Sequence, residues 1–211
     1  MKTGILFDLD GTLLDTLEDL LDATNYALAL CGHPGRTLPE LRRFVGNGAE
    51  NQIRLSLPED HKEDLPKALA AYKPYYTDHC QIKTKPYEGV LSALKNLGEK
   101  YPIAIVSNKP DSAVKALCAD YFPGLYALGE VAGCPRKPAA DMVFKAMREI
   151  GVDRCVYVGD SEVDVLTAKN AGVPCLSVLW GFRDQEILVE AGADHFCENP
   201  HDLLKDLKEM I

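Results

Sequence analysis

The sequence predicts an α/β protein with a doubly wound, mainly parallel sheet and an inserted α-helical cap. Two observations lead to this fold class. Short apolar runs alternate with helical segments through the second half of the chain, and a long helical stretch follows the first run. The 211 residues, 46% of them hydrophobic, are enough to bury a full-sized core without metals or disulfides.

Four apolar runs have the length and composition of strands that are buried on both faces. They occupy residues 4–7, 103–106, 155–158 and 174–178, and a weaker strand is expected at 126–128. Between the later runs, apolar residues recur every three or four positions, which predicts helices at 111–121, 139–150 and 162–171. Strands that alternate with helices pair in parallel through crossover connections, so one mainly parallel sheet is expected.

Residues 16–80 interrupt this alternation. They hold no convincing strand, and their apolar spacing predicts helices at 19–30, 39–45, 49–55 and 59–76. The predicted organisation is therefore a catalytic core of residues 1–15 and 81–211 with a helical cap at 16–80.

The charge balance bears on partners and location. Twenty-three basic against 32 acidic residues give a net charge of −9, which disfavours binding to nucleic acid or anionic lipid. No apolar run approaches the ~20 residues of a membrane helix, and no signal peptide is expected. Seven scattered cysteines without a Cys-x-x-Cys pair indicate reduced thiols and a cytoplasmic location, and the five histidines show no ligand spacing.

Polar side chains follow the predicted strands. Because ligands of open α/β sheets bind beyond the carboxyl ends of the strands, these side chains are expected to meet at one edge. The candidates are Asp8, Asp10 and Thr12 after the first strand, Ser107, Asn108 and Lys109 after the second, Asp160 and Asp164 after the strand at 155–158, and Lys137 ahead of the helix at 139–150.

Several carboxylates at one edge require a compensating cation, because like charges within a few ångströms raise one another's pKa. Oxygen ligands favour Mg²⁺, whose coordination a substrate phosphate usually completes. A metal, a lysine, a hydroxyl and a carboxylate that can attack phosphorus are the groups that phosphoryl transfer needs. The expected substrate is a small phosphorylated metabolite.

Asp8 and Asp10 are separated by one residue, so on an extended strand end they point to the same side. Our hypothesis is that Asp8 is the nucleophile that forms an aspartyl-phosphate. Asp10 would protonate the leaving alkoxide and then deprotonate the water that hydrolyses the intermediate.

These residues stand in four ordered motifs: Asp8-Leu9-Asp10-Gly11-Thr12-Leu13, Ser107-Asn108-Lys109, Lys137-Pro138 and Gly159-Asp160-Ser161-x-x-Asp164. In this order they resemble the signature motifs of the haloacid dehalogenase superfamily of phosphohydrolases. The resemblance covers the whole core, and the helical insertion resembles the small α-helical cap of that family.

The resemblance implies a role for each matched residue. Asp8, Asp10 (through its backbone carbonyl) and Asp160 would hold Mg²⁺. Ser107 and Lys137 would hold the phosphoryl oxygens, and Thr12 would restrain Asp10. Thr12, Asn108 and Lys109 are also expected to contact the substrate. Asp164 would orient the lysine or a metal-bound water. The sequence departs from the family at Val163, where asparagine is common, and at Ala140, where a second proline often follows the lysine.

Within the cap, Val45-Gly46-Asn47-Gly48 resembles the substrate-specificity loop of the phosphoglycolate phosphatase branch, which makes 2-phosphoglycolate the leading candidate substrate. A simpler interpretation is that Gly46-Asn47-Gly48 only reverses the chain. Arg43 could meet a substrate carboxylate or could be an exposed arginine at a helix end.

Two other functions are alternatives. A phosphomutase of the same superfamily would return the phosphoryl group to a bound intermediate. A non-enzymatic phospho-acceptor domain also has an acidic pocket on a doubly wound sheet, but it carries its acceptor on a middle strand and has no cap of this size. No feature of the sequence specifies an oligomeric state.

Overall fold

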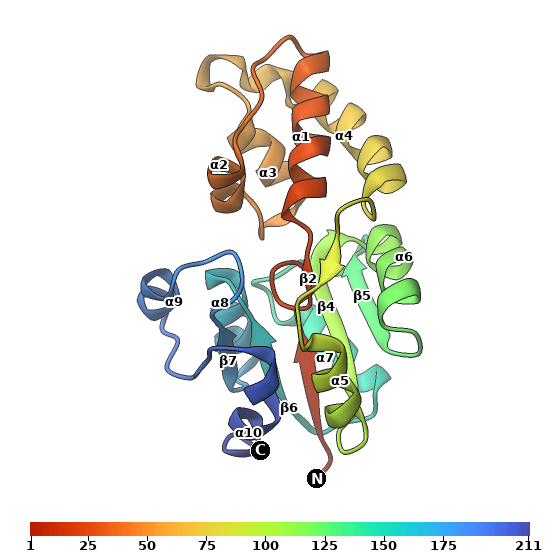
Figure 1. Ribbon diagram of the computed structural model, residues 1–211, viewed down its shortest axis with the longest axis vertical. Helices are drawn as coiled ribbons and strands as arrows, with labels where there is room; N and C mark the ends of the chain where they lie inside the picture. The colour runs from red at the N-terminus through yellow and green to blue at the C-terminus, as the bar shows by residue number, and fades with distance from the viewer. The chain divides into compact units, whose positions relative to one another are not determined.

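The computed structural model describes residues 1–211, which form two compact units (Figure 1). One unit comprises residues 1–15 and 86–211, and the other comprises residues 16–85. The second unit thus ends at residue 85, somewhat beyond position 80 of the predicted cap. Two short strands, β2 (Leu14–Asp15) and β3 (Lys85–Pro86), pair where the chain leaves and re-enters the first unit.

The first unit is built on a six-stranded sheet with the order β5-β4-β1-β6-β7-β8, in which every neighbouring pair is parallel. The predicted α/β fold class is confirmed. The strands are β1 (Thr3–Phe7), β4 (Ile103–Pro110), β5 (Tyr126–Glu130), β6 (Arg154–Gly159), β7 (Cys175–Val178) and β8 (Phe196–Cys197).

The central strands read as continuous apolar runs because both of their faces are covered. In β1, the successive residues Ile5, Leu6 and Phe7 are all fully buried. Leu6 packs in a cluster with Ala104 of β4, Tyr157 of β6 and residues of α7 and α8. The period of two therefore places Ile5 and Phe7 on the opposite, equally buried face.

Six helices and a short 3₁₀ segment complete this unit. They are α5 (Val90–Gly98), α6 (Asp111–Tyr121), α7 (Asp141–Glu149), α8 (Glu162–Ala171), α9 (Gln185–Ala191), η2 (Pro200–Asp202) and α10 (Leu203–Lys208). The predicted helices at 111–121 and 162–171 match α6 and α8. The elements α5, α9, β8 and α10 were not predicted from the sequence.

One local prediction was wrong in a way that matters for the site. Ser107, Asn108 and Lys109 were expected after the second strand, but they belong to β4 itself. The strand extends past its apolar run because pairing with β5 resumes at Pro110 after a register shift between Val106 and Pro110. All three polar residues are buried.

The second unit is helical, as expected. It contains α1 (Leu17–Leu30), α2 (Leu38–Phe44), α3 (Gly48–Ser56), the 3₁₀ segment η1 (Glu59–Asp64) and α4 (Leu65–His79). The single helix predicted at 59–76 is thus two elements, with Pro66 in the first turn of α4. Helices α1 and α4 pack against each other. Ala27 and Leu28 of α1 and Tyr72 of α4 are buried. No helix of the molecule combines the length and the apolar character needed to span a bilayer.

The buried carboxylate of Asp19 binds the C-terminal end of this unit to its first helix. Asp19 of α1 is only 2% exposed. It accepts hydrogen bonds from the backbone N–H of Lys83 at 3.0 Å and of Thr84 at 2.8 Å, and from the Thr84 hydroxyl at 2.8 Å. These bonds satisfy a buried charge and hold the segment that leads into β3.

Candidate active site

The candidate site lies at the carboxyl ends of the central strands of the α/β unit. From β1, the sheet continues on one side through β4 and β5 and on the other through β6, β7 and β8. The strand order therefore reverses at β1, and ligands of open α/β sheets bind at such a point. Asp8 and Asp10 follow β1 directly, and Asp160 follows β6.

Lys137 is the cation at the centre of the site. It is 1% exposed, and its Nζ lies 2.9 Å from Oδ1 of Asp8 and 2.7 Å from Oδ1 of Asp164. The same ammonium group donates a hydrogen bond of 3.0 Å to the Tyr157 hydroxyl. Burial alone would lower the pKa of Lys137, but the carboxylates of Asp164 and Asp8 outweigh burial and raise this pKa well above its ordinary value. The two carboxylates therefore favour the charged form of Lys137.

Both carboxylate oxygens of Asp164 accept hydrogen bonds. Oδ1 contacts Lys137, while Oδ2 accepts hydrogen bonds from the backbone N–H of Ser161 at 3.1 Å and from its hydroxyl at 2.6 Å. Ser161 is the N-cap of α8, so this pair forms a capping box that fixes the first turn of the helix. The capping box of α8 thus fixes the position of the Asp164 carboxylate, which in turn orients Lys137.

Asp8, Asp160 and Asp164 bring carboxylate oxygens within 4.8 Å of one another, and all three residues are buried. Burial raises the pKa of Asp8 well above its ordinary value, the charge of Asp164 adds to this, and Lys137 opposes it. Burial, together with Asp164, likewise raises the pKa of Asp160 to about 7. One lysine does not neutralise this group, and the excess of negative charge on oxygen ligands fits a divalent hard cation.

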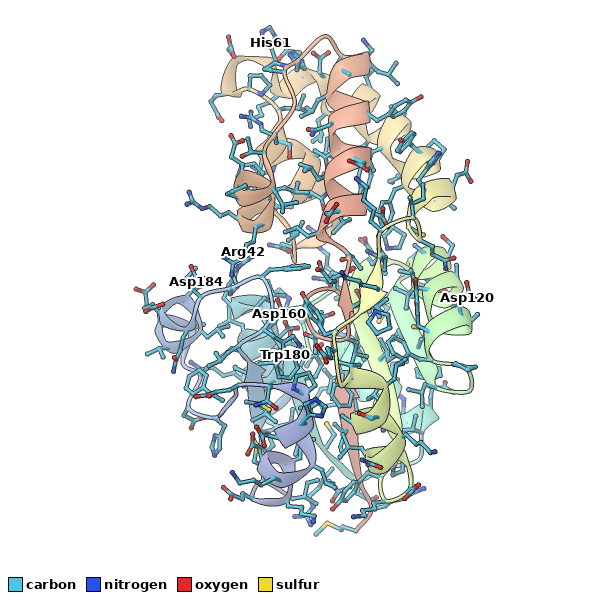
Figure 2. All side chains as sticks on the ribbon, viewed as in Figure 1. Arg42, His61, Asp120, Asp160, Trp180 and Asp184 are labelled. Atoms are coloured by element: carbon cyan, nitrogen blue, oxygen red, sulfur yellow. The ribbon has the colours of Figure 1, made fainter.

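The carboxylate of Asp160 is positioned by two segments. The Thr12 hydroxyl donates to Oδ1 at 2.9 Å, and the backbone N–H of Phe182 donates to Oδ2 at 2.8 Å. Trp180 in turn donates its indole N–H to the carbonyl oxygen of Thr12 at 2.9 Å. Figure 2 labels Asp160 and Trp180, which Thr12 connects.

Two glycines allow these segments to approach Asp160. Gly11 has a φ of 84°, a left-handed conformation that side chains rarely adopt, and a Cβ there would overlap the Asp160 carboxylate. A Cβ on Gly181 would overlap the Cβ and carboxylate of the same residue. Both positions therefore exclude any larger residue as long as Asp160 keeps its place.

Asp10 is paired with Lys109. The Lys109 Nζ donates to Oδ1 of Asp10 at 2.7 Å, and the lysine side chain is only 3% exposed, compared with 17% for the aspartate. The lysine thus holds one Asp10 oxygen. The sequence resemblance assigned this restraint to Thr12, but the Thr12 hydroxyl bonds to Asp160 instead.

Ser107 and Asn108 occupy the end of β4. The Ser107 Oγ accepts a hydrogen bond of 3.2 Å from the backbone N–H of Lys109. The Asn108 side-chain amide donates to the carbonyl oxygen of Lys137 at 2.9 Å and accepts from its N–H at 2.8 Å. Asn108, predicted to touch substrate, is therefore engaged in fixing the backbone of Lys137.

Three contributors were not found from the sequence. Tyr157 lies within a predicted apolar strand, yet its hydroxyl accepts a hydrogen bond from Lys137 and donates one to the carbonyl oxygen of Val106 at 3.2 Å. The sequence feature that could have indicated this role is a tyrosine, with its polar hydroxyl, inside an otherwise apolar strand. Trp180 and the backbone of Phe182 carried no signal, because their role depends on a loop that is distant in sequence from Asp160.

The cap residues of the prediction lie in the helical unit. Arg43 is exposed in the last turn of α2, and Gly46, Asn47 and Gly48 form the turn before and into α3. Gly46 and Gly48 both have positive φ values, 107° and 79°, so this turn requires glycine at both positions.

Comparison with known proteins places the chain in a family. Residues 5–178 match the model of the haloacid dehalogenase-like hydrolases. The chain is 33% identical to phosphoglycolate phosphatase 1 of Pseudomonas aeruginosa over 95% of its own length and 78% of that protein. It is 36% identical to a phosphoglycolate phosphatase of Rhodobacter capsulatus over 87% of both chains. A crystal structure from Lactobacillus delbrueckii subsp. bulgaricus, described as a candidate phosphoglycolate phosphatase, has a TM-score of 0.90 at 39% identity and covers 96% of this chain and 97% of that one.

The chain belongs to the haloacid dehalogenase-like hydrolases. Within this family it is a phosphoric monoester hydrolase of the phosphoglycolate phosphatase-like branch.

Proposed function

We propose that the protein is a Mg²⁺-dependent phosphatase that hydrolyses a small phosphate monoester through an aspartyl-phosphate on Asp8, with 2-phosphoglycolate as its substrate. The observation that carries this proposal is the buried group of Asp8, Asp160 and Asp164 around Lys137, with Asp8 directly after the central strand. The relatives named phosphoglycolate phosphatase, at 33% and 36% identity, support the choice of substrate.

Asp8 supplies the nucleophile. Its Oδ1 is occupied by Lys137 and by the backbone N–H of Leu9, at 2.9 Å and 2.7 Å, so the carboxylate is held in one orientation. Attack by a carboxylate oxygen on phosphorus forms an acyl phosphate and expels the alkoxide of the ester. The neighbouring Lys137 stabilises the added negative charge on the phosphoryl oxygens.

Asp10 acts as the general acid and then as the general base. In the first step it gives a proton to the leaving alkoxide, and in the second it takes a proton from the water that attacks the acyl phosphate. The contact with Lys109 at 2.7 Å keeps the Asp10 side chain in one place for both steps. Ser107, at the end of β4, supplies a hydroxyl for a phosphoryl oxygen.

Asp8, Asp160 and the Asp10 carbonyl are the groups we assign to Mg²⁺. When bound, the ion neutralises charge on the phosphoryl oxygens and on the carboxylates. In the helical unit, we assign Arg43 and the turn at Gly46, Asn47 and Gly48 to selection of the ester, since an exposed guanidinium can pair with the carboxylate of phosphoglycolate.

The test is phosphate release from a panel of phosphate esters, including 2-phosphoglycolate and phosphosugars, with and without Mg²⁺. We expect Mg²⁺-dependent release with the highest kcat/KM for 2-phosphoglycolate, and no turnover by Asp8→Asn. Full activity of Asp8→Asn would exclude the covalent mechanism. An isomerised phosphosugar without free phosphate would instead indicate a mutase.

A further inference from the structure

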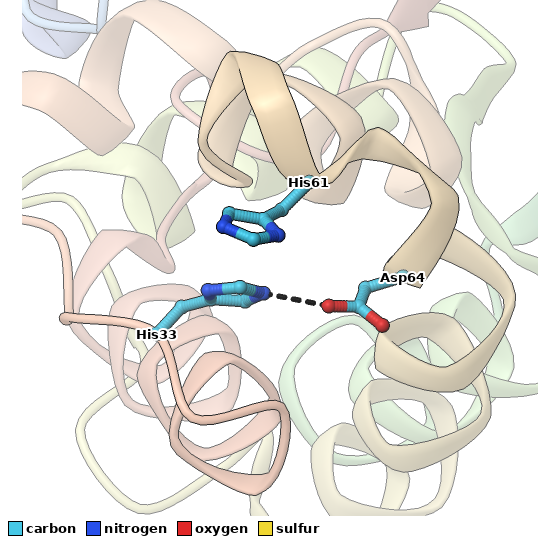
Figure 3. Close-up of side chains that lie close together, drawn as sticks. All are labelled: His33, His61 and Asp64. Carbon is cyan, nitrogen blue, oxygen red and sulfur yellow. Dashed lines mark hydrogen bonds and ion pairs between the residues drawn. The ribbon is translucent and has the colours of Figure 1, made fainter.

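The histidines show no ligand spacing in the sequence, but the fold brings two of them together with an aspartate. His33, in the loop after α1, lies beside His61 and Asp64 of η1 within the helical unit (Figure 3). The Nε2 of His33 is 2.8 Å from Oδ2 of Asp64. The two imidazole rings have centroids 4.9 Å apart at an interplanar angle of 40°.

The three side chains can offer ligand atoms that all lie within 4.8 Å of one another. His61 and Asp64 both belong to η1, and the backbone of this segment is kinked at His61, where φ is −133° and ψ is 30°. His33 is 28 positions before His61 in the chain (61 minus 33), so no short motif in the sequence announces the group.

The surroundings of the group favour a cation. Carboxylate oxygens of Asp60 and Glu63 lie 3.7 Å from the two ring nitrogens of His61. The side chain of His33 is 9% exposed, whereas Asp64 is 30% and His61 47% exposed. One ligand is therefore sheltered and fixed, and the other two can be reached from solvent.

The hydrogen bond between His33 and Asp64 defines what an incoming ion must replace. A carboxylate accepts and has no proton to give, so Nε2 of His33 carries the proton of this bond. A metal ion that binds both atoms takes the place of that proton, which leaves to solvent.

We infer that His33, His61 and Asp64 form a binding site for a divalent transition-metal ion of the Zn²⁺ type. Imidazole nitrogens with one carboxylate suit Zn²⁺, whereas Mg²⁺ prefers the oxygen ligands found around Asp8 and Asp160. Three protein ligands leave a fourth tetrahedral position for water. A bound ion would join the loop after α1 to η1 and so stabilise the helical unit.

Isothermal titration of the full chain with Zn²⁺, in the presence of excess Mg²⁺, tests this site. We expect one Zn²⁺ per chain, with about one proton released to the buffer as the ligands are metallated. Because its ring is half exposed, His61→Ala leaves the fold intact, and it should weaken Zn²⁺ binding by at least about tenfold. Asp64→Asn should do the same.

His195→Ala is the matched control. His195 also pairs with a carboxylate, its Nδ1 lying 2.7 Å from Oδ1 of Asp194, but it belongs to no group of three ligands. This variant should bind Zn²⁺ like the wild type. Equal weakening by His195→Ala, or unchanged binding in both His61→Ala and His33→Ala, would overturn the proposal.

Two spectroscopic readouts are independent of turnover. Co²⁺ in place of Zn²⁺ should give the visible absorption of a tetrahedral site in the wild type and lose it in His61→Ala. Zn²⁺ should also raise the Tm of the wild type but not of His61→Ala, because an ion that binds only the folded state stabilises it. A Tm increase of the same size in both proteins would contradict the assignment.

Discussion

The Nζ of Lys137 lies 2.9 Å from Oδ1 of Asp8 in a site where both side chains are more than nine-tenths buried. The same nitrogen contacts Asp164, which the capping box of α8 holds in place. The charge of this one lysine therefore stabilises two buried carboxylates and meets the phosphoryl group that Asp8 attacks.

Replacement of Lys137 should lower both stability and turnover. Lys137→Met leaves Asp8 and Asp164 without their cation, and breaking a buried ion pair on one side costs about 3–5 kcal/mol. Denaturant unfolding in metal-free buffer measures this loss. Added Mg²⁺ should restore part of it, because the ion neutralises the same carboxylates.

The control is Lys115→Met. Lys115 forms an ion pair with Asp111, but its side chain is 65% exposed. Exposed pairs of this kind contribute little to stability, because solvent screens them. A loss in Lys137→Met that is no larger than in Lys115→Met would contradict the role of Lys137.

Asp10 and Lys109 should affect turnover according to the leaving group. Asp10→Asn cannot protonate the departing alkoxide, so kcat should fall by about 10²–10⁴ for alkyl phosphates. The fall should be much smaller in the burst phase with p-nitrophenyl phosphate, whose leaving group needs no proton. Lys109→Met should show the same dependence in weaker form, because the lysine positions Asp10 at 2.7 Å. If Asp10→Asn lowered the burst rate equally with alkyl phosphates and with p-nitrophenyl phosphate, Asp10 would not be the general acid.

Mg²⁺ binding should weaken as pH falls. The pKa of Asp160 is raised to about 7, mainly by burial. Above that pH the carboxylate is ionised and can ligate, whereas below it a proton competes with the ion. We therefore expect the Tm increase caused by Mg²⁺ to be larger at about pH 8 than at about pH 5.5.

In the metal-free protein, ionisation of Asp160 at higher pH lowers the stability of the fold. Because the pKa of Asp160 is higher in the folded state than its ordinary value of 3.8, ionisation costs folding free energy. That cost is fully present above about pH 7 and disappears toward pH 4, so this group makes the metal-free protein less stable at the higher pH. Asp160→Asn should remove both the cost and the response to Mg²⁺.

Gly181 should be needed for metal binding although it carries no side chain. Gly181→Ala places a Cβ against Asp160 and must displace its carboxylate, so the affinity for Mg²⁺ should fall by about 10–100-fold. Gly98→Ala is the matched control, since the nearest atom to a Cβ there is Cδ1 of Ile103 at 3.8 Å. Titration of Mg²⁺ by thermal shift compares the two variants, and equal affinities would contradict the role of Gly181.

The sequence predicted the sheet and the ordered motifs because buried parallel strands are continuous apolar runs and because polar residues follow them. It did not reveal that Ser107 to Lys109 lie inside β4, since strand pairing resumes at Pro110 beyond the apolar run. Tyr157 was missed because its ring packs like any core residue while only its hydroxyl reaches Lys137. The group of His33, His61 and Asp64 was missed because it forms only when the loop after α1 meets η1.

The stereochemical course at phosphorus tests the covalent mechanism most directly. A phosphorothioate analogue of the ester, chiral through sulfur and two oxygen isotopes, would be hydrolysed by the wild-type enzyme in water enriched in the third oxygen isotope, and the configuration of the inorganic thiophosphate product would be determined. Attack by Asp8 followed by attack of water comprises two in-line displacements, so the account predicts retention of configuration. Inversion would mean that water attacks the ester directly and would contradict Asp8 as the nucleophile.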